Sequence, residues 1–344
     1  MPRRAGDSLT SAAPMEARTA AELPSGPGWW FEPKWDGFRC LAFRAGGEVI
    51  LQAKSGKPLT RFFPEVAERL AALDEPAFAL DGELLIADGA AFSFEQLQLR
   101  LHPAESRIRK LAASHPATLA LFDMLEDAGG RDLRAEPLRV RREALAVFLA
   151  RHQGPRLTGT PGTEDRALAE AWLADGAVEG VIAKRLDAPY LEGERAMLKI
   201  KRVRTADCVV GGFRYLEGSP LVGSLLLGLF DDAGRLDHVG FTSGFAGLDR
   251  AALTRELEAS RGGPGFTGDA PGGPSRWSDA RSAAWTPVRP ELVVEVSFDH
   301  VSGGRFRHGT RLIRFRPDKA PAQCRMDQIA VPPPGPLPGA SASA

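Results

Sequence analysis

Short runs of alternating apolar and polar residues, typical of strands, recur along the chain. Helical patterns separate these runs before Arg204 but become rare after it. Before that residue, strands are predicted at 36–44, 48–53, 77–87, 117–125, 179–185 and 196–202. Apolar residues at helical spacing predict helices at 64–73, 137–150 and 164–175. This mixture of strands and helices restricts the first part of the chain to an α+β fold with mixed or antiparallel sheets.

Beyond Arg204 strands dominate the pattern. Alternating or apolar runs predict strands at 206–215, 221–230, 235–244, 291–300 and 310–316, with one helix at 249–259. Five strands with one helix favour a small β-barrel of the OB type.

The length of 344 residues is enough for two medium-sized domains. Because the pattern changes at 201–204, we expect one domain at 22–202 and a second at 203–330. The flanking segments 1–21 and 331–344 lack periodicity and are rich in Ala, Ser, Pro or Gly. They are expected to be disordered tails.

The composition is typical of a soluble globular protein, with 43% hydrophobic and 26% charged residues. Glycines interrupt the apolar run at 221–230, which is too short to span a bilayer. The residues after Arg3 and Arg4 lack the apolar core of an export signal, so a cytoplasmic protein is expected. Cys40, Cys208 and Cys324 form no CxxC or Cys/His pattern, which predicts neither a disulfide nor a zinc site.

The formal net charge of zero conceals a basic stretch. Between Arg305 and Arg325 the only acidic residue is Asp318, among seven basic ones. Such a stretch suits phosphate binding, although a solvated edge strand is the plainer alternative.

Lysine is much rarer than arginine in this chain. It occurs only at positions 34, 54, 57, 110, 184, 199, 201 and 319. Arginine can replace lysine on a solvated surface, but not where an amine must lose its proton and attack. The remaining lysines are therefore candidates for chemistry, although Lys184 could equally be a snorkelling surface lysine, and we assign it no role.

The most promising chemical site is the segment EPKWDGFR at 32–39, because the chain contains no GxxxxGK[ST] loop and no GxGxxG after a strand. A free lysine amine has a pKa of about 10.4, so a nucleophilic Lys34 needs desolvation or nearby positive charge. Lys199 and Lys201 can supply that charge. Asp36, Glu83 and Glu179 stand at edges of predicted strands, where side chains from distant segments converge on one cleft.

KWDGFR resembles the KxDGxR signature of the covalent nucleotidyltransferases, which include DNA ligases, RNA ligases and mRNA capping enzymes. Further segments resemble the other motifs of that superfamily in order: AKSGKPLTRFFPE, LDGELL, LFDML, EGVIAK, LKIKR and RFRPDK. The resemblance covers roughly residues 25–325. Within the superfamily, the sequence most resembles the compact bacterial ATP-dependent DNA ligases of the C type. This resemblance implies an adenylyltransferase (ATP-grasp-like DNA ligase) domain with antiparallel sheets, followed by an OB-fold β-barrel.

The resemblance also implies residue roles in a DNA ligase that uses ATP with Mg²⁺ or Mn²⁺. Lys34 would carry AMP, while Asp36 and Glu179 would position the metal ion. The nucleotide contacts would be Glu32 to the adenine amino group, Arg39 near the ribose or nick terminus, Glu83 to the ribose, Phe122 stacked on adenine, Lys199 and Lys201 to the α-phosphate, and Arg316, Asp318 and Lys319 to pyrophosphate.

One position departs from the pattern of many DNA ligases. Where they place an arginine before an NG-like turn, this chain has Lys54 before Ser55 and Gly56. A lysine cannot make the bidentate phosphate contact of an arginine. The 5′-phosphate of a nick would therefore be held by Lys54 as a point charge or by a neighbour such as Arg61.

Two other functions compete with the ligase interpretation. An RNA ligase or capping guanylyltransferase shares the nucleophile motif, although Glu32 favours adenine. A non-catalytic nucleic-acid-binding module is opposed by the presence of Lys34, Glu179, Lys199 and Lys201. The expected partners are nicked duplex DNA and a repair protein that delivers the nick, and the expected enzyme is a monomer that does not bind membranes.

Overall fold

The computed structural model describes residues 9–89, 91–175, 178–202, 204–245, 247–272, 284–307 and 309–330. Within them the chain forms two compact units, and the division falls between Arg202 and Arg204. The predicted tail at 331–344 and the first eight residues lie outside the described residues.

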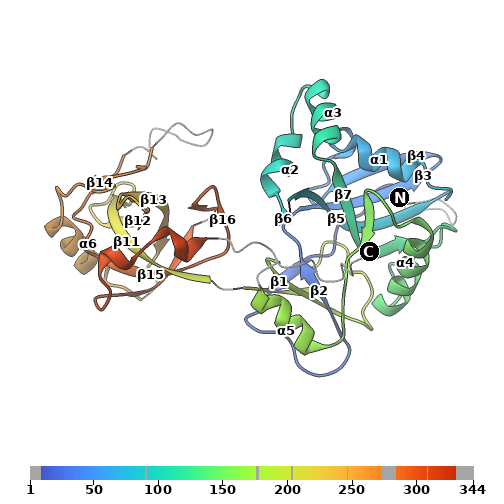
Figure 1. Ribbon diagram of the computed structural model, residues 1–344. Coiled ribbons are helices and arrows are strands. Elements are labelled where there is room, and N and C mark those ends of the chain that lie inside the picture. Colours follow the sequence, from blue (N-terminus) through green and yellow to red (C-terminus); the bar gives the residue numbers. More distant parts are fainter. Residues whose placement is uncertain are drawn as a thin grey trace. The chain divides into compact units, whose positions relative to one another are not determined.

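The first unit is an α+β domain (Figure 1). Its strands are β1 (Ala17–Thr19), β2 (Trp29–Lys34), β3 (Phe38–Ala45), β4 (Glu48–Ala53), β5 (Phe78–Asp88), β6 (Ala91–Phe92), β7 (Ala117–Glu126), β8 (Leu157–Gly159), β9 (Gly180–Arg185) and β10 (Met197–Lys201). Its helices are the 3-10 turn η1 (Thr60–Phe62), α1 (Pro64–Ala71), α2 (Phe94–Arg100), α3 (Glu105–Ser114), α4 (Leu138–His152) and α5 (Arg166–Asp175).

These strands form two sheets. The larger has the order β4-β3-β5-β7-β8, with β6 beside β5, and is antiparallel except for the β7–β8 pair. The smaller has the order β1-β10-β9-β2, with only β1 and β10 parallel. The expected antiparallel and mixed sheets are therefore present.

Helices cover one face of each sheet and leave another face for the site. Helices α1 and α4 pack on the larger sheet around a core that includes Leu80, Leu121 and Phe148. Helix α5 packs against β2 and β9. Side chains alternate along a strand, so the buried Phe31 and Val181 face this helix while their strand neighbours point the other way.

The expectation of a disordered N-terminal tail over residues 1–21 is wrong for residues 9–21. Leu9, Ala12 and Met15 are buried, and β1 pairs with β10. The Leu9 amide donates to Glu126 at 2.7 Å and the Met15 amide donates to the Tyr190 hydroxyl at 2.9 Å. The residues that hold this segment in place lie more than a hundred positions away in the sequence. Local periodicity could therefore not reveal that the segment is ordered.

Some elements of the first unit have no counterpart in the sequence prediction. Strand β2 was not predicted, because its sequence WWFEPK is not alternating and contains a proline. Helices α2 and α3 were also missed, since only Ile108 and Ala112 of α3 are buried and the apolar stripe is correspondingly weak.

The second unit is a β-barrel. Its elements are β11 (Arg204–Tyr215), β12 (Val222–Phe230), β13 (Leu236–Gly244), α6 (Arg250–Ala259), β14 (Thr286–Pro287), β15 (Val293–Phe298), β16 (Val301–Ser302), β17 (Arg305–Phe306), β18 (Thr310–Phe315) and the 3-10 turns η2 (Pro321–Gln323) and η3 (Met326–Ile329). The order β12-β13-β18-β15-β11, with β11 also pairing with β12, closes five strands into the predicted OB-type barrel. None of the described helices is long and apolar enough to cross a membrane.

Candidate active site

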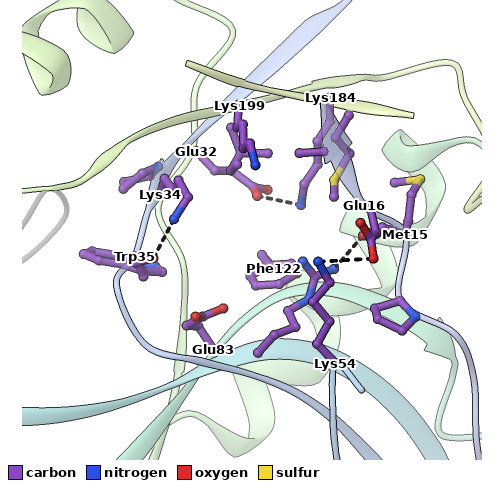
Figure 2. Close-up of a pocket in the computed structure, with 16 residues that line it drawn as sticks. Met15, Glu16, Glu32, Lys34, Trp35, Lys54, Glu83, Phe122, Lys184 and Lys199 are labelled. Atoms are coloured by element: carbon purple, nitrogen blue, oxygen red, sulfur yellow. Dashed lines mark hydrogen bonds and ion pairs between the residues drawn. The ribbon is translucent and has the colours of Figure 1, made fainter. Parts of the chain in front are cut away.

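A cavity of about 280 Å³ opens between the two sheets of the first unit (Figure 2). The smaller sheet contributes Glu32, Lys34, Ile182, Lys184 and Lys199 to its wall. Arg39, Glu83 and Phe122 come from β3, β5 and β7 of the larger sheet, and Lys54 follows β4. Residues that lie far apart in the sequence therefore converge on one space.

Strand register aligns the polar residues of the smaller sheet in rows. Lys34 on β2 and Lys201 on β10 are both partners of Gly180 on the intervening β9. In the next row, Ile182 stands between Glu32 and Lys199. Because side chains alternate with period two, members of these rows share the face opposite the α5 core.

Lys34 lies beside the carboxylate of Glu179. Its Nζ contacts one carboxylate oxygen, while Nζ of Lys201 lies 2.8 Å from the other. Burial pushes the pKa of Glu179 upward, but the charge of Lys34 and hydrogen bonds from Lys201 and Lys34 outweigh it, so the pKa is below its usual value. Glu179 thus stays a carboxylate between two amines.

Positive charge is concentrated around this pair. Burial, together with the charges of Lys201, Lys34 and Lys54, lowers the pKa of Lys199. The like charges indicate a site that favours an anion, and a phosphate chain is one that would relieve their repulsion.

Two glycines of the motifs are required by close packing. A Cβ at Gly37 would collide with the Leu84 carbonyl oxygen, and one at Gly180 would collide with the Ile200 carbonyl oxygen. Gly37 allows the turn that follows Lys34 to approach β5. Gly180 allows β10, which carries Lys201, to pack closely against β9, the strand between Lys201 and Lys34.

Glu32 is buried and has partners at both carboxylate oxygens. Oε1 accepts from Trp30 Nε1 at 2.9 Å and from Arg142 Nη1 at 3.2 Å. Lys184 Nζ lies 2.6 Å from Oε2, and its side chain is only 3% exposed. The two strong hydrogen bonds and the ion pair fix the orientation of the carboxylate at the cavity wall.

The ring of Phe122 forms part of the cavity wall and carries two cations. Arg39 Cζ lies 4.5 Å from the ring centroid and Lys184 Nζ lies 4.4 Å from it. Arg39 is held in place by Asp81, with Nη2 donating to Oδ2 at 2.6 Å. Tyr190 donates to the same oxygen at 2.6 Å.

Glu83 also lines this cavity, and its carboxyl group has an unusual pKa. Burial raises its pKa to about 7, against the opposing charges of Arg39 and Lys34. A carboxyl that is partly protonated near neutral pH can donate as well as accept a hydrogen bond.

Two regions of the chain match the sequence models of known protein families. Residues 12–201 match the ATP dependent DNA ligase domain, and residues 218–319 match the ATP dependent DNA ligase C terminal region. Together these matches cover most of both units. The chain belongs to the ATP-dependent DNA ligases.

Two relatives of this ligase are mycobacterial proteins. It is 45% identical to DNA ligase C1 of Mycolicibacterium smegmatis over 332 residues, covering 93% of this chain and 94% of that protein. It is 38% identical to DNA ligase C of Mycobacterium tuberculosis over 343 residues, covering 94% and 95%. A solved Lig E DNA ligase shares the fold, with a TM-score of 0.53 and 18% identity over 88% of this chain and all of that one. The resemblance to compact bacterial ligases of the C type is confirmed.

Two parts of the ligase cavity escaped the sequence analysis. One is the segment Pro14–Ala17, which lines the cavity and places Glu16 Oε1 3.1 Å from Lys54 Nζ. The other is Lys184, which is buried in the cavity wall. The scarcity of lysine was the signal that could have identified it.

The second unit of the ligase contains a cluster around Asp207 on β11. Arg316 Nη1 donates to Oδ1 at 2.8 Å and Lys319 Nζ donates to Oδ2 at 2.6 Å. Arg316 also forms a two-pronged pair with Asp318. The three motif residues Arg316, Asp318 and Lys319 are thus brought together within this unit.

The metal expectation for the ligase rests on Asp36 and Glu179. Asp36 lies in the turn between β2 and β3. Among the described residues, no group of three or more His, Cys, Asp or Glu side chains is arranged to hold a metal ion. A site that uses few protein carboxylates suits Mg²⁺, which usually shares its coordination with substrate phosphates and water.

Proposed function

We propose that this ligase seals nicks in duplex DNA through a lysyl-AMP intermediate on Lys34. The observation that carries the proposal is the contact of Lys34 with Glu179, at the mouth of a cavity that also contains Glu32, Phe122 and Lys199. Such a cavity combines a nucleophile, a base-binding end and positive charge for phosphates.

ATP fits the chemistry of the cavity. Phe122 offers an aromatic surface for adenine, and Glu32 offers an acceptor for its amino group. Lys199 and Lys201 supply positive charge for the phosphates. Glu83 lies on the opposite wall, where it would contact the ribose.

In the first step the Lys34 Nζ attacks the α-phosphorus of ATP. The P–N bond forms, the bond between the α-phosphorus and the bridging oxygen breaks, pyrophosphate leaves, and the amine releases a proton to solvent. Glu179 orients the amine, while the cationic side chains stabilise the negative charge that grows on the leaving group.

A divalent cation would be held by Glu179 and Asp36 together with the ATP phosphates. When bound, it supplies Lewis-acid stabilisation of charge on the reacting phosphate. Arg316 and Lys319 of the second unit would bind the departing pyrophosphate.

The remaining two steps transfer AMP and join the DNA ends. The 5′-phosphate of the nick attacks the lysyl-AMP, which releases Lys34 and yields 5′-adenylated DNA. The 3′-hydroxyl then attacks the 5′-phosphate, forming the phosphodiester bond and releasing AMP. Lys54 is proposed to hold the 5′-phosphate as a point charge.

Labelled nucleotides provide the direct test. The purified full chain is incubated with Mg²⁺ and α-labelled ATP or GTP, and label on the protein is measured. ATP should label the wild type and leave Lys34→Ala unlabelled. Label from GTP but not ATP would show a guanylyltransferase instead, and no label from either would oppose catalysis.

Sealing assays test the later steps. A 5′-phosphorylated DNA nick is compared with a nick that contains ribonucleotides, and the DNA nick should be sealed. Lys34→Ala should fail from ATP but still join a preadenylated nick. Wild-type sealing by Lys34→Ala from ATP would refute the mechanism.

A role in DNA repair belongs to the same proposal, supported by the resemblance to bacterial C-type ligases. We also propose a cytoplasmic monomer that a repair protein recruits to nicks. Loss of the gene should sensitise cells to agents that leave nicks, and unchanged survival would oppose a repair role.

A further inference from the structure

Tyr190 is buried beside the cavity, in the segment between β9 and β10, and the proposed reaction assigns it no role. We infer that Tyr190 is a positioning residue, which acts through Asp81 to hold the Arg39 guanidinium in the orientation that meets the bound substrates. The inference rests on the proposed function, because Arg39 lines the cavity in which ATP and the nick would react.

A closed ring of hydrogen bonds joins Tyr190, Asp81, Arg39 and the backbone of Met15. The Tyr190 hydroxyl donates to Asp81 Oδ2 at 2.6 Å and accepts from the Met15 amide at 2.9 Å. Arg39 Nη2 donates to the same Asp81 oxygen at 2.6 Å and to the Met15 carbonyl oxygen at 3.4 Å. Arg39 Nε donates to the other oxygen, Oδ1, at 2.5 Å. Each member of the ring is therefore held by two neighbours.

The Tyr190 hydroxyl is a permanent donor in this ring. Tyr190 is 5% exposed, and Asp81 is fully buried. Burial and the negative charge of Asp81 raise the pKa of the Tyr190 hydroxyl well above its usual value, so the group keeps its proton. Its single hydrogen goes to Asp81, and its lone pairs accept from the Met15 amide. Without this donor the buried carboxylate would be less well stabilised and would rearrange together with Arg39.

Tyr190 is itself fixed by the fold. Its amide donates to the carbonyl oxygen of Arg134 at 2.8 Å, and the Arg141 guanidinium lies 5.7 Å from the centre of its ring. Arg141 is in turn held in a buried ion pair with Asp123 at 2.8 Å. The hydroxyl therefore gives Asp81 a fixed partner that belongs to neither β3 nor β5, the strands that carry Arg39 and Asp81.

The ring leaves one nitrogen of Arg39 for a ligand. A guanidinium has five N–H donors, and the ring uses those on Nε and Nη2. In the part of the chain that the structure describes, no group accepts from Nη1, so its two donors remain for a ligand in the cavity. Because the guanidinium is planar, its contact with Asp81 sets the direction of Nη1. A displacement of about 1 Å in such a group can slow a reaction about a hundredfold.

The alternative is that Tyr190 only anchors residues 9–19, because its hydroxyl accepts from Met15. The two roles differ in what the loss of the hydroxyl changes. A positioning role lowers the rate at which folded enzyme reacts, and it does so only through Arg39. An anchoring role lowers the fraction of enzyme that is folded and active, whatever residue stands at position 39.

The experiment is a double-mutant cycle of Tyr190→Phe and Arg39→Lys in the full chain. Phenylalanine removes only the hydroxyl, and lysine keeps a positive charge beside Asp81 while it removes Nη1. Lysyl-AMP formation is followed by intact mass, and the final step is followed by sealing of a preadenylated nick, both with saturating substrate. Tyr215→Phe is the matched control, because Tyr215 is the only other tyrosine and its exposed hydroxyl donates to Glu258 in the second unit.

We expect Arg39→Lys to slow at least one of the two steps about 10- to 100-fold, which is the contribution of a hydrogen bond to a charged group. Tyr190→Phe should slow that same step about tenfold, with the same final amount of lysyl-AMP per protein molecule as wild type. In the Arg39→Lys background, Tyr190→Phe should slow the step no further, because both changes act on one interaction. Tyr215→Phe should match wild type in both steps.

Multiplying effects of the two changes would overturn the inference, as would unchanged rates in Tyr190→Phe or in Arg39→Lys. A lower yield of lysyl-AMP at an unchanged rate would assign Tyr190 to anchoring alone, and urea unfolding would then show the matching loss of stability. A wild type that forms no lysyl-AMP and seals no nick would refute the proposed function instead. The same cycle, measured on the dissociation constant of ATP, would still test whether Tyr190 acts through Arg39.

Discussion

Lys34 and Lys201 lie on opposite sides of Gly180, and each is the strand partner of that glycine. This relationship makes their common contact with Glu179 a consequence of strand register. It also makes the site depend on how closely β9 and β10 approach, since a side chain at position 180 would collide with the backbone of Ile200.

Replacement of Gly180 by alanine should therefore destabilise the first unit. The added methyl must displace backbone, so we expect a loss of about 1–3 kcal/mol in the free energy of unfolding, measured with urea, together with slower adduct formation. Gly154→Ala is the matched control, because the nearest atom to an added Cβ there lies 3.9 Å away. Equal stability of the two variants would contradict the packing argument.

Glu83 predicts a dependence of stability on pH. Because its folded-state pKa of about 7 lies above the usual value of about 4.3, the native state binds the proton more tightly than the unfolded state. The resulting stabilisation is complete below about pH 4 and is lost as the pH rises through 7.

The variant Glu83→Gln cannot undergo this titration. Its stability relative to wild type should thus rise by about 1–3 kcal/mol between pH 5 and pH 8.5, measured by urea unfolding at each pH. Glu48→Gln, at an exposed position on β4 away from the cavity, serves as the control. A difference between Glu83→Gln and wild type that stays constant with pH would exclude the raised pKa.

Glu16 and Lys54 predict an effect on DNA binding rather than on stability. Their pair is partly exposed, so its loss should change stability by less than about 1 kcal/mol. If Lys54 holds the nick 5′-phosphate, Glu16→Gln should tighten binding of nicked DNA several-fold at low salt, because a competing carboxylate is removed.

Fluorescence anisotropy with nicked duplexes would measure this effect. The gain from Glu16→Gln should vanish in a Lys54→Ala background and when the nick lacks its 5′-phosphate. Glu194→Gln, a nearby exposed change, should bind like wild type. If the gain in DNA affinity persists without Lys54, it comes from the loss of one negative charge near the DNA and not from a freed Lys54.

The sequence was informative wherever chemistry fixes residue types at short spacing. Lys34 and Glu32 occupy one strand and alternate onto one face, so a local motif placed both correctly at the cavity. Glu83 was placed near the site by its position in a predicted strand as well as by the resemblance, whereas Lys54 was placed there only by the resemblance, because strand register, not local spacing, brings both residues to the cavity.

Long-range contacts account for what the sequence analysis missed. The segment that carries Met15 and Glu16 has little local pattern, yet distant partners such as Tyr190 hold it against the cavity. Lys184 follows an apolar run and resembles a snorkelling lysine until its proximity to Glu32 is known. Pairing across strands is a property of the fold that neither residue reveals by itself.

The cluster around Asp207 predicts a defect confined to one chemical step. Asp207 holds both Arg316 and Lys319, which we propose to bind the departing pyrophosphate. Asp207→Asn should remove the charge that aligns them and slow lysyl-AMP formation at least about tenfold, since hydrogen bonds to charged groups contribute about 1.5–3 kcal/mol. Sealing of a preadenylated nick releases no pyrophosphate and should proceed at nearly the wild-type rate. Asp232→Asn, which removes an exposed partner of Arg325 in the same unit, should leave both steps unchanged. If Asp207→Asn slowed the two steps equally, the cluster would be acting on DNA or on folding, and the assignment of Arg316 and Lys319 to pyrophosphate would have to be withdrawn.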